Sequence, residues 1–243
     1  MYFSQGNLQA TTSDLGAHWS WAFAANQWDY IGFDVNGNIN GNGTVSANGT
    51  VDLFGWVGAS SNWTGAAQYG ISNSYATNAT DGYGNVADEA LKSDWGNTIG
   101  SGWRTLTSAE WQYVFNSRTT TSGVLYARAT VNNERGVILL PDNWSTSYYS
   151  LTSTNTADAA FTTNNITTSD WTNSLEAHGA VFLPVAGSRG GQSVVLAYGL
   201  YWSSSPESNT KAYCVIFMDN SLDPAGNAVR YQGCSVRLVR NAN

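Results

Sequence analysis

Cysteine and histidine are the side chains best suited to nucleophilic and acid–base chemistry, and the chain contains only His18, His178, Cys214 and Cys234. A Ser-His-Asp or Cys-His mechanism would need one of these imidazoles beside a nucleophile. His18 lies among aromatic residues and His178 closes a predicted helix, so a packed side chain or a helix-end charge explains each of them without catalysis. The histidines therefore do not indicate an enzyme.

Pairs of carboxylates are the other possible catalytic groups, because glycosidases use two of them. The candidates are Asp88, Glu89, Glu110, Asp158, Asp170 and Glu176. Glu110 is expected to cap a helix, and the others lie near predicted helix starts or in polar loops, with no spacing that favours acid–base work. The chain also lacks a phosphate-binding loop and a dinucleotide-binding fingerprint. We therefore predict no catalytic residue and no cofactor.

Two cysteines are too few for a zinc site or a disulfide framework, so we predict no metal site. We expect Cys214 and Cys234 on neighbouring strands, where a single bridge is possible if their Cβ atoms lie about 4 Å apart. We prefer free thiols, and the bridge remains the alternative.

The composition indicates an aromatic-rich domain whose polar surface carries few charges, a pattern that suits a protein outside the cell. Hydrophobic residues make up 42% of the 243 residues, enough for a packed core, and only 11% are charged. Such a surface contacts ligands through hydroxyls, amides and rings rather than through ion pairs. The net charge of −7, without a basic stripe, argues against a nucleic-acid partner.

No window approaches the roughly 18 apolar residues of a membrane span, so we expect no direct membrane insertion of this segment. Residues 1–8 lack the regions of a signal peptide, and we expect any export signal or anchor upstream. The aromatic pattern runs on without a Pro- or Ser-rich linker, which predicts one cooperative domain over residues 1–243.

Two short helices are predicted. Thr107 and Glu110 have the spacing of a capping box, and Trp111 follows on the face that should pack on the core. A second helix begins near Thr168 and stops before Gly179, a natural left-handed C-terminal residue. A weaker helical pattern covers residues 87–95.

Strands are predicted at residues 3–8, 136–140, 180–183, 201–204, 211–218 and 233–239. Residues 36–49 superficially resemble a calcium-binding repeat, but an Asn-Gly run more often makes plain turns. Residues 219–227 are expected to form an exposed loop. Helices between groups of strands, rather than alternating with them, predict an α+β fold with small antiparallel sheets and long irregular loops.

Two passages carry a family resemblance: residues 102–111 read GWRTLTSAEW, and the tail runs from YWSSS at 201–205 to SVRLVR at 235–240. Together they resemble C-type-lectin-fold domains of the formylglycine-generating-enzyme type. The branch most similar occurs in Bacteroidetes surface proteins and in variable proteins of diversity-generating retroelements. The resemblance implies a C-type-lectin-like fold with two main helices, a loop-rich insertion at about 34–100, and a variable ligand-binding region at 201–237.

The resemblance further implies a non-catalytic ligand-recognition domain, an adhesin or receptor-binding module on a cell surface or a phage tail. Its unknown partner would be a protein or glycan on a cell surface. We predict that Arg104, Glu110 and Trp111 belong to the scaffold, because the capping box and the adjoining core tryptophan anchor the first helix. The implied ligand contacts are Glu207, Asn209, Lys211, Met218, Asn220, Leu222, Asp223, Asn227, Val229, Tyr231 and Gln232, with Tyr231 and Met218 as the anchors.

Alternation in residues 211–218 favours part of this surface. Tyr213, Val215 and Phe217 suit a core-facing side, which would leave Cys214, Ile216 and Met218 facing outward. The alternative is that both faces of this strand are buried.

Other functions remain open. One is an oxidase of the formylglycine-generating type that uses Cys214 or Cys234, although the reactive pair of that family is separated by only a few residues. A second is a passive structural surface domain. Calcium-dependent sugar binding is not implied, because the signature strings of those lectins do not occur. If the tail does not bind the ligand, residues 36–85 are the next candidates.

Overall fold

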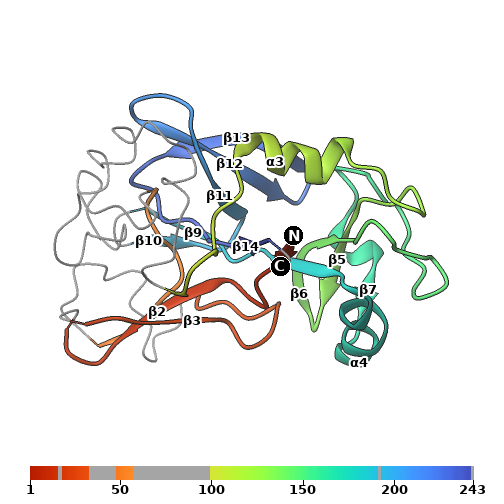
Figure 1. The fold of residues 1–243 in the computed structure, drawn as a ribbon, viewed down its shortest axis with the longest axis horizontal. Coiled ribbons are helices and arrows are strands. Elements are labelled where there is room, and N and C mark those ends of the chain that lie inside the picture. The colour runs from red at the N-terminus through yellow and green to blue at the C-terminus, as the bar shows by residue number, and fades with distance from the viewer. Residues whose placement is uncertain (16–17, 33–47, 57–98, 191–192, 242–243) are drawn as a thin grey trace.

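The computed structural model describes residues 1–15, 18–32, 48–56, 99–190 and 193–241. These residues form several small β-sheets with a few short helical turns (Figure 1). The predicted α+β, C-type-lectin-like class with two main helices is therefore wrong: the described chain is β-rich, and its longest α-helical segment has five residues. The loop-rich insertion, the calcium-like stretch and the weak helix at 87–95 lie mostly or wholly outside the described residues.

The central sheet is antiparallel and has the order β11-β12-β13. Its strands are β11 (Gly199–Pro206), β12 (Lys211–Met218) and β13 (Ser221–Val229). On the other side of β11 the chain returns at Ser235, which forms a parallel bridge with Tyr201. The predicted strand at 233–239 is thus reduced to isolated bridges and the short β14 (Val239–Arg240), which pairs with β1 (Tyr2–Phe3).

A four-stranded sheet with the order β7-β5-β6-β8 separates the two helical segments. It consists of β5 (Tyr126–Val131), β6 (Glu134–Leu139), β7 (Asn165–Ile166) and β8 (Val181–Pro184). Alternating residues of β6 face opposite sides, so Val137 packs with Trp111 of the first helical segment and Ile138 packs with Trp171 of the second. The predicted strands at 136–140 and 180–183 are confirmed within one or two residues.

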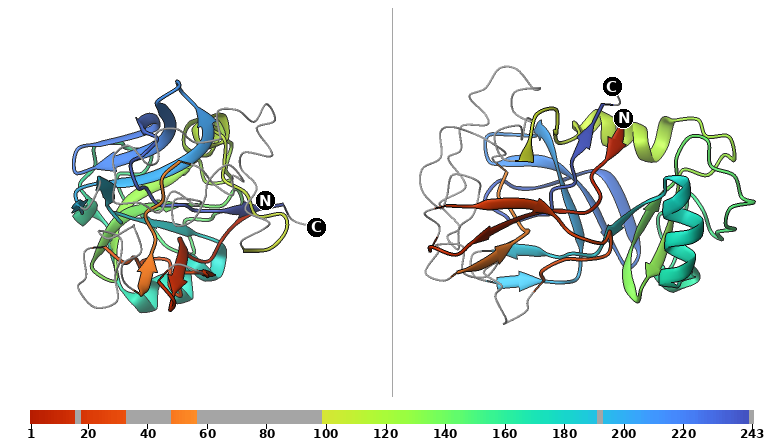
Figure 2. Two further views of the ribbon diagram at one scale, coloured as in Figure 1. Left: turned by 90° about the vertical axis from the view of Figure 1, so that its left-hand side faces the viewer. Right: turned by 60° about the horizontal axis from the view of Figure 1, so that its bottom comes forward.

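The smaller sheets complete the fold (Figure 2). The N-terminal sheet contains β2 (Leu8–Thr12), β3 (Ser20–Phe23) and β4 (Gly49–Val51), and a hairpin contains β9 (Ser188–Gly190) and β10 (Ser193–Val195). Residues 3–8 were expected to be one strand, but they are divided between the end of β1 and the start of β2.

The predicted capping box is confirmed at the start of α3 (Ser108–Gln112), where Thr107 accepts a hydrogen bond from the Glu110 backbone and Glu110 reaches back to Thr107. After this single α-turn the chain continues as a π-helical turn, Tyr113–Ser117. The second segment repeats the pattern, with α4 (Thr168–Asp170), a π-helical turn at Trp171–Leu175 and a 3₁₀ turn at Glu176–His178, and it ends at left-handed Gly179. A further 3₁₀ turn, Phe161–Thr163, precedes β7.

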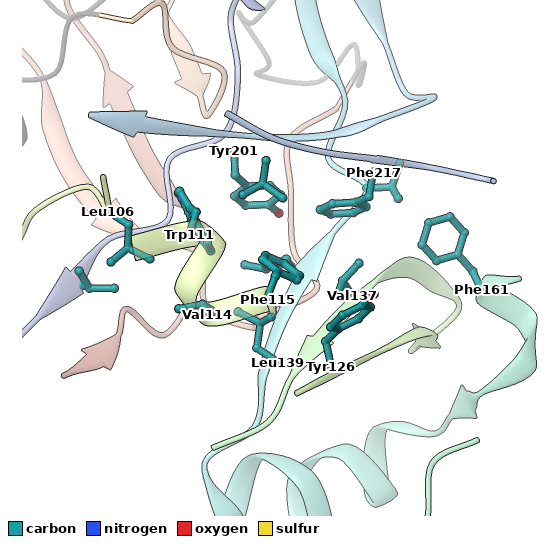
Figure 3. Close-up of a cluster of buried hydrophobic side chains, with 14 residues drawn as sticks. Leu106, Trp111, Val114, Phe115, Tyr126, Val137, Leu139, Phe161, Tyr201 and Phe217 are labelled. Atoms are coloured by element: carbon teal, nitrogen blue, oxygen red, sulfur yellow. The ribbon is translucent and has the colours of Figure 1, made fainter. Parts of the chain in front are cut away.

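Two core clusters meet at the central sheet. Val215 and Phe217 face the cluster around Trp111, where Phe217 stacks on Tyr201 (Figure 3). Cys214 faces the other cluster, which also contains Trp202. The prediction that Cys214 and Ile216 face outward is therefore wrong, because β12 is covered on both sides. Of that set only Met218 is exposed, at the end of the strand.

The segment expected to be an exposed loop forms most of β13 instead. Pro224 and Gly226 suggested a loop, since proline cannot donate to a sheet and glycine weakens a strand. The register between β12 and β13 shifts between Cys214 and Ile216, and this irregularity accommodates Pro224. A local signal for a turn was thus overridden by pairing with β12.

Candidate functional site

Burial divides the C-terminal region into scaffold and surface. Residues 201–204 and 233–239 are all buried. In contrast, none of the predicted contact residues is buried: Glu207, Asn209, Lys211, Met218, Asn220, Asp223 and Asn227 are exposed, and Leu222, Val229, Tyr231 and Gln232 are half-buried.

These residues do not form one surface. One group surrounds the turn between β11 and β12 and consists of Glu207, Asn209, Lys211, Val229, Tyr231 and Gln232, which we call the first turn surface. A second group, Met218, Asn220, Leu222 and Asp223, lies at the turn between β12 and β13. Lys211 and Met218 end the same strand, so roughly 23 Å separate the two groups. Asn227 lies between them on β13.

The first turn surface is held by Arg230. Its guanidinium lies 4.4 Å from the centroid of the Trp56 ring, and its Nη2 donates to the Ser208 carbonyl at 2.6 Å. Its backbone N–H donates to the Thr210 carbonyl at 2.9 Å. A buried, planar guanidinium that binds the turn backbone fixes the loop while leaving its side chains free to point outward.

The second turn is held in the same way from the four-stranded sheet. Arg128 of β5 is fully buried, lies over the Phe161 ring and donates to the carbonyls of Met218 and Ser221. Arg135 of β6 adds an ion pair of 2.6 Å with Asp219. In both turns, therefore, an arginine holds the backbone in place while the neighbouring side chains are exposed.

The possible nucleophiles are sequestered. Cys214 and Cys234 are free thiols and are at most 1% exposed. Burial raises the pKa of the Cys214 thiol to about 12 and that of Cys234 well above 9, so neither forms a thiolate readily. Their expected placement on neighbouring strands is wrong, because Trp202 of β11 pairs with Cys214 while Tyr201 of β11 bridges to Ser235 on the other side. Both thiols nevertheless belong to the same apolar cluster.

The histidines contact neither thiol. His18 is not packed among aromatics as expected, because its side chain is 89% exposed and pairs with Asp14 at 2.6 Å. His178 accords with the prediction of a helix-end residue, since its Nδ1 lies 2.8 Å from the Ser174 carbonyl, and its ring stacks on Tyr148. Within the described ranges, no three His, Cys, Asp or Glu side chains are grouped so that they could hold a metal ion.

A cavity of about 540 Å³ lies away from both turns, between the N-terminal strand, the end of β6 and the ends of the two helical segments. Its lining is Met1–Gln5, Gln27, Tyr113, Val114, Arg118, Leu139–Asp142, Glu176 and Gly179–Val181. The volume is in the range of small-molecule sites, and the walls are mainly apolar with a few polar groups.

The first π-helical turn borders this cavity, and the second ends directly before a residue that lines it. Tyr113 and Val114 belong to the first, and Glu176 directly follows the second. A π-helical turn is a costly interruption of an α-helix and is found frequently at functional sites. The backbone therefore departs from regular α-helix geometry in one turn that lines the cavity and in one turn that adjoins it.

A buried amide connects the cavity to the core. The Gln27 Nε2 donates to Glu176 Oε1 at 2.8 Å and to the Ala180 carbonyl at 3.3 Å. Its Oε1 accepts from the Phe182 backbone N–H at 2.8 Å and from Arg237 Nη2 at 2.7 Å. All the hydrogen-bonding groups of this amide are used, so Glu176 is held in one orientation.

Sequence reasoning missed this cavity. The sequence pattern places Glu176 only among the possible paired carboxylates and predicts no role for Gln27. No local pattern marks either residue, because the cavity forms from segments that are far apart in the chain.

Comparison with known proteins gives one match. Residues 137–239 match the model of a family described as a domain of unknown function, DUF8237. The matched range runs from β6 to β14 and includes the central sheet with both turns. No curated protein and no solved structure matches the chain. In the part of the chain that the structure describes, no helix is long and apolar enough to cross a membrane.

Proposed function

We propose that this chain is a non-catalytic ligand-recognition domain that uses the first turn surface to bind a protein or glycan outside the cell. One observation carries the proposal: none of the predicted contact residues is buried, whereas residues 201–204 and 233–239 on either side of them are all buried. Substitutions at the turn can therefore change the ligand without removing core contacts. Loops on a rigid scaffold are where binding function concentrates.

The chemistry of the first turn surface suits such a role. Tyr231 offers a large amphipathic ring, Asn209 and Gln232 offer amide donors and acceptors, and Glu207 and Lys211 supply one charge of each sign. Tyrosine is enriched among the residues that dominate binding interfaces. Because Arg230 fixes the turn backbone, little conformational entropy is lost when a ligand binds.

The oxidase alternative is disfavoured by the burial of both thiols. A reactive cysteine needs an accessible, electropositive setting that favours its thiolate. Cys214 lies in an apolar cluster, and Asp223 adds to the rise in its pKa.

The test is a binding screen of the purified chain against a glycan array and intact gut bacteria. A variant with Glu207, Asn209, Lys211, Tyr231 and Gln232 all changed to alanine should lose any binding found, with little change in melting temperature. The matched control changes Met218, Asn220 and Asp223 at the opposite turn and should retain binding. Loss of binding only in the control variant would move the site to the other turn. Retention in both variants, or no binding at all, would favour residues 36–85 or a passive surface.

A further inference from the structure

We propose that the cavity beside Gln27 and Glu176 is a second, separate site, which binds a small organic amine: a primary ammonium group attached to an apolar body. The site shares no residue with the first turn surface. The proposal therefore does not depend on the function of the turns.

The apolar part of the ligand is dictated by the walls. Phe3, Val114, Leu139, Leu140 and Val181 come from four different segments and line the same space of about 540 Å³. Desolvating a small hydrocarbon or aromatic group against such walls is favourable in proportion to the area buried.

Two carboxylates at the cavity favour a ligand with a positively charged group. Glu176 and Asp142 both line the cavity, and each has one oxygen engaged: Glu176 Oε1 with Gln27 and Asp142 Oδ1 with Arg118. The second oxygen of each carboxylate accepts no hydrogen bond from the described residues. An ammonium ion is the donor that such acceptors bind most strongly, because both partners are charged.

The arginines around the cavity are engaged by groups of the protein itself. Arg118 donates from Nε to the Val114 carbonyl at 2.8 Å, from Nη1 to Asp142 at 3.0 Å and from Nη2 to the Leu125 carbonyl at 2.6 Å. Arg237 is buried and reaches Glu176 only through the Gln27 amide. Arg118 is thus paired with Asp142, whereas the Glu176 carboxylate at the cavity has no ion-pair partner among the described residues.

Two aromatic rings at the cavity favour a cation further. Tyr2 and Tyr113 are 46% and 54% exposed and both line the cavity. An ammonium group held over such a ring is attracted by the negative face of the π-system. Exposed tyrosines beside carboxylates thus form the kind of surface that recognises organic cations.

The orientation of Glu176 is fixed in advance. Its partner Gln27 makes four hydrogen bonds and is 6% exposed, so the carboxylate does not need to be ordered when the ligand enters. Preorganisation of this kind raises affinity by reducing the entropy lost on binding.

The experiment is a calorimetric titration of the full chain with 2-phenylethylamine, compared with 2-phenylethanol and phenylacetate as neutral and anionic analogues of similar shape. We expect saturable binding of the amine at one site, about tenfold or more tighter than the alcohol, and no binding of the acid. Equal binding of the three compounds, or preference for the acid, would overturn the proposal.

Two variants locate the site. Glu176→Gln keeps an oxygen that can accept from Gln27 but removes the charge, and it should weaken amine binding by about tenfold while leaving binding of the alcohol unchanged. Tyr113→Ala, at an exposed position, should also weaken the amine. The control Glu207→Gln removes a carboxylate at the first turn surface and should have no effect.

Unchanged amine affinity in both cavity variants would also contradict the proposal that the amine binds in this cavity. If Glu176→Gln does not fold, the amine affinity of Tyr113→Ala alone tests the location of the site. A short peptide with a single lysine provides a final comparison. If it binds more tightly than 2-phenylethylamine, the natural source of the ammonium is a protein side chain and the assignment to a small free amine is wrong.

Discussion

The completely buried guanidinium of Arg237 donates a hydrogen bond from Nη2 to the side-chain carbonyl of Gln27 at 2.7 Å, across 210 positions of the sequence. Its other hydrogen bonds go to the side chain of Asn7 and the backbone of Gln5. Burial lowers the pKa of Arg237 to about 10, and the charges of Tyr201 and Glu176 oppose this shift. A charge in the core is thus satisfied mostly by neutral oxygens, which makes each of them important.

Gln27→Leu should therefore be strongly destabilising. The variant leaves an Arg237 N–H buried without its acceptor and releases Glu176, at a cost of roughly 3 kcal/mol in the free energy of unfolding. Urea denaturation measures this value. Gln5→Ala is the matched control, because it keeps the backbone carbonyl that Arg237 uses, and it should cost less than about 1 kcal/mol. Equal effects of the two changes would refute the role given to the amide.

Trp111→Ala should lower the free energy of unfolding by about 3–5 kcal/mol, as for other core aromatic truncations. The ring is fully buried, packs near Phe3 and Phe115, and donates from Nε1 to the Trp202 carbonyl at 3.3 Å. Thermal and urea unfolding test this, with exposed Tyr113→Ala as the control in the next turn. A Trp111 variant that stays fully stable but loses ligand would reverse the assignment of this residue to the scaffold.

Arg128→Lys should loosen the turn between β12 and β13. Lysine keeps the charge but cannot donate at once to the carbonyls of Met218, Ser221 and Ala157, so we expect a loss of roughly 2 kcal/mol. Hydrogen exchange at residues 218–222 should accelerate relative to the wild type. The half-exposed Arg135→Lys provides the comparison, and if it accelerates exchange as much, the burial of Arg128 is not what fixes the turn.

The buried thiols predict a loss of stability in alkali. In the unfolded chain a thiol ionises near pH 9, whereas burial holds the pKa of Cys214 at about 12 in the folded state. Between these values the unfolded chain releases a proton that the folded chain keeps, so the free energy of unfolding falls as the pH rises, by up to about 1.4 kcal/mol per pH unit for this group.

Cys214→Ala should flatten this slope without abolishing it, because Cys234 and the buried Tyr201, whose pKa is also raised, shift in the same direction. Urea titrations from pH 8 to pH 11 measure the slope, and an unchanged slope would mean that Cys214 is accessible. Mass spectrometry before and after reduction should show no change, since both cysteines are free and β11 lies between the segments that carry them.

One cooperative melting transition is expected for the whole chain. The cluster around Trp111 draws residues from Leu106 to Val239, and β1 pairs with β14 at the opposite end of the sequence. Calorimetry would contradict this if two separated transitions appeared.

The sequence predicted those elements whose signals are local. The capping box at Thr107 and Glu110, the left-handed Gly179 and strand β12 were each correct, because they depend on neighbouring residues. The overall class was wrong, because the described chain is β-rich. The π-helical turns that follow α3 and α4 were not predicted either, since the sequence pattern indicated ordinary short helices.

The candidate sites divide in the same way. The exposure of the predicted contact residues follows from the contrast between the YWSSS and SVRLVR strings, which are buried except for their last residues, and the polar segment between them. Their separation into two turns depends on the pairing register of β12 and β13. This register could not be predicted, because most of β13 was expected to be a loop. Gln27 and Glu176 are 149 positions apart, and only the tertiary structure brings them together.

Pro224 in β13 has a consequence for how the molecule behaves at high concentration. Among the described strands β13 pairs only with β12, so it is an outer strand of nine residues, a length that could recruit a second copy through its free backbone groups. Proline offers no N–H to an incoming strand, the local irregularity twists the edge, and exposed Asp223 and Asn227 bring charge and polarity to it. Pro224, which makes this strand resemble a loop in the sequence, is therefore also expected to oppose edge-to-edge aggregation of the protein.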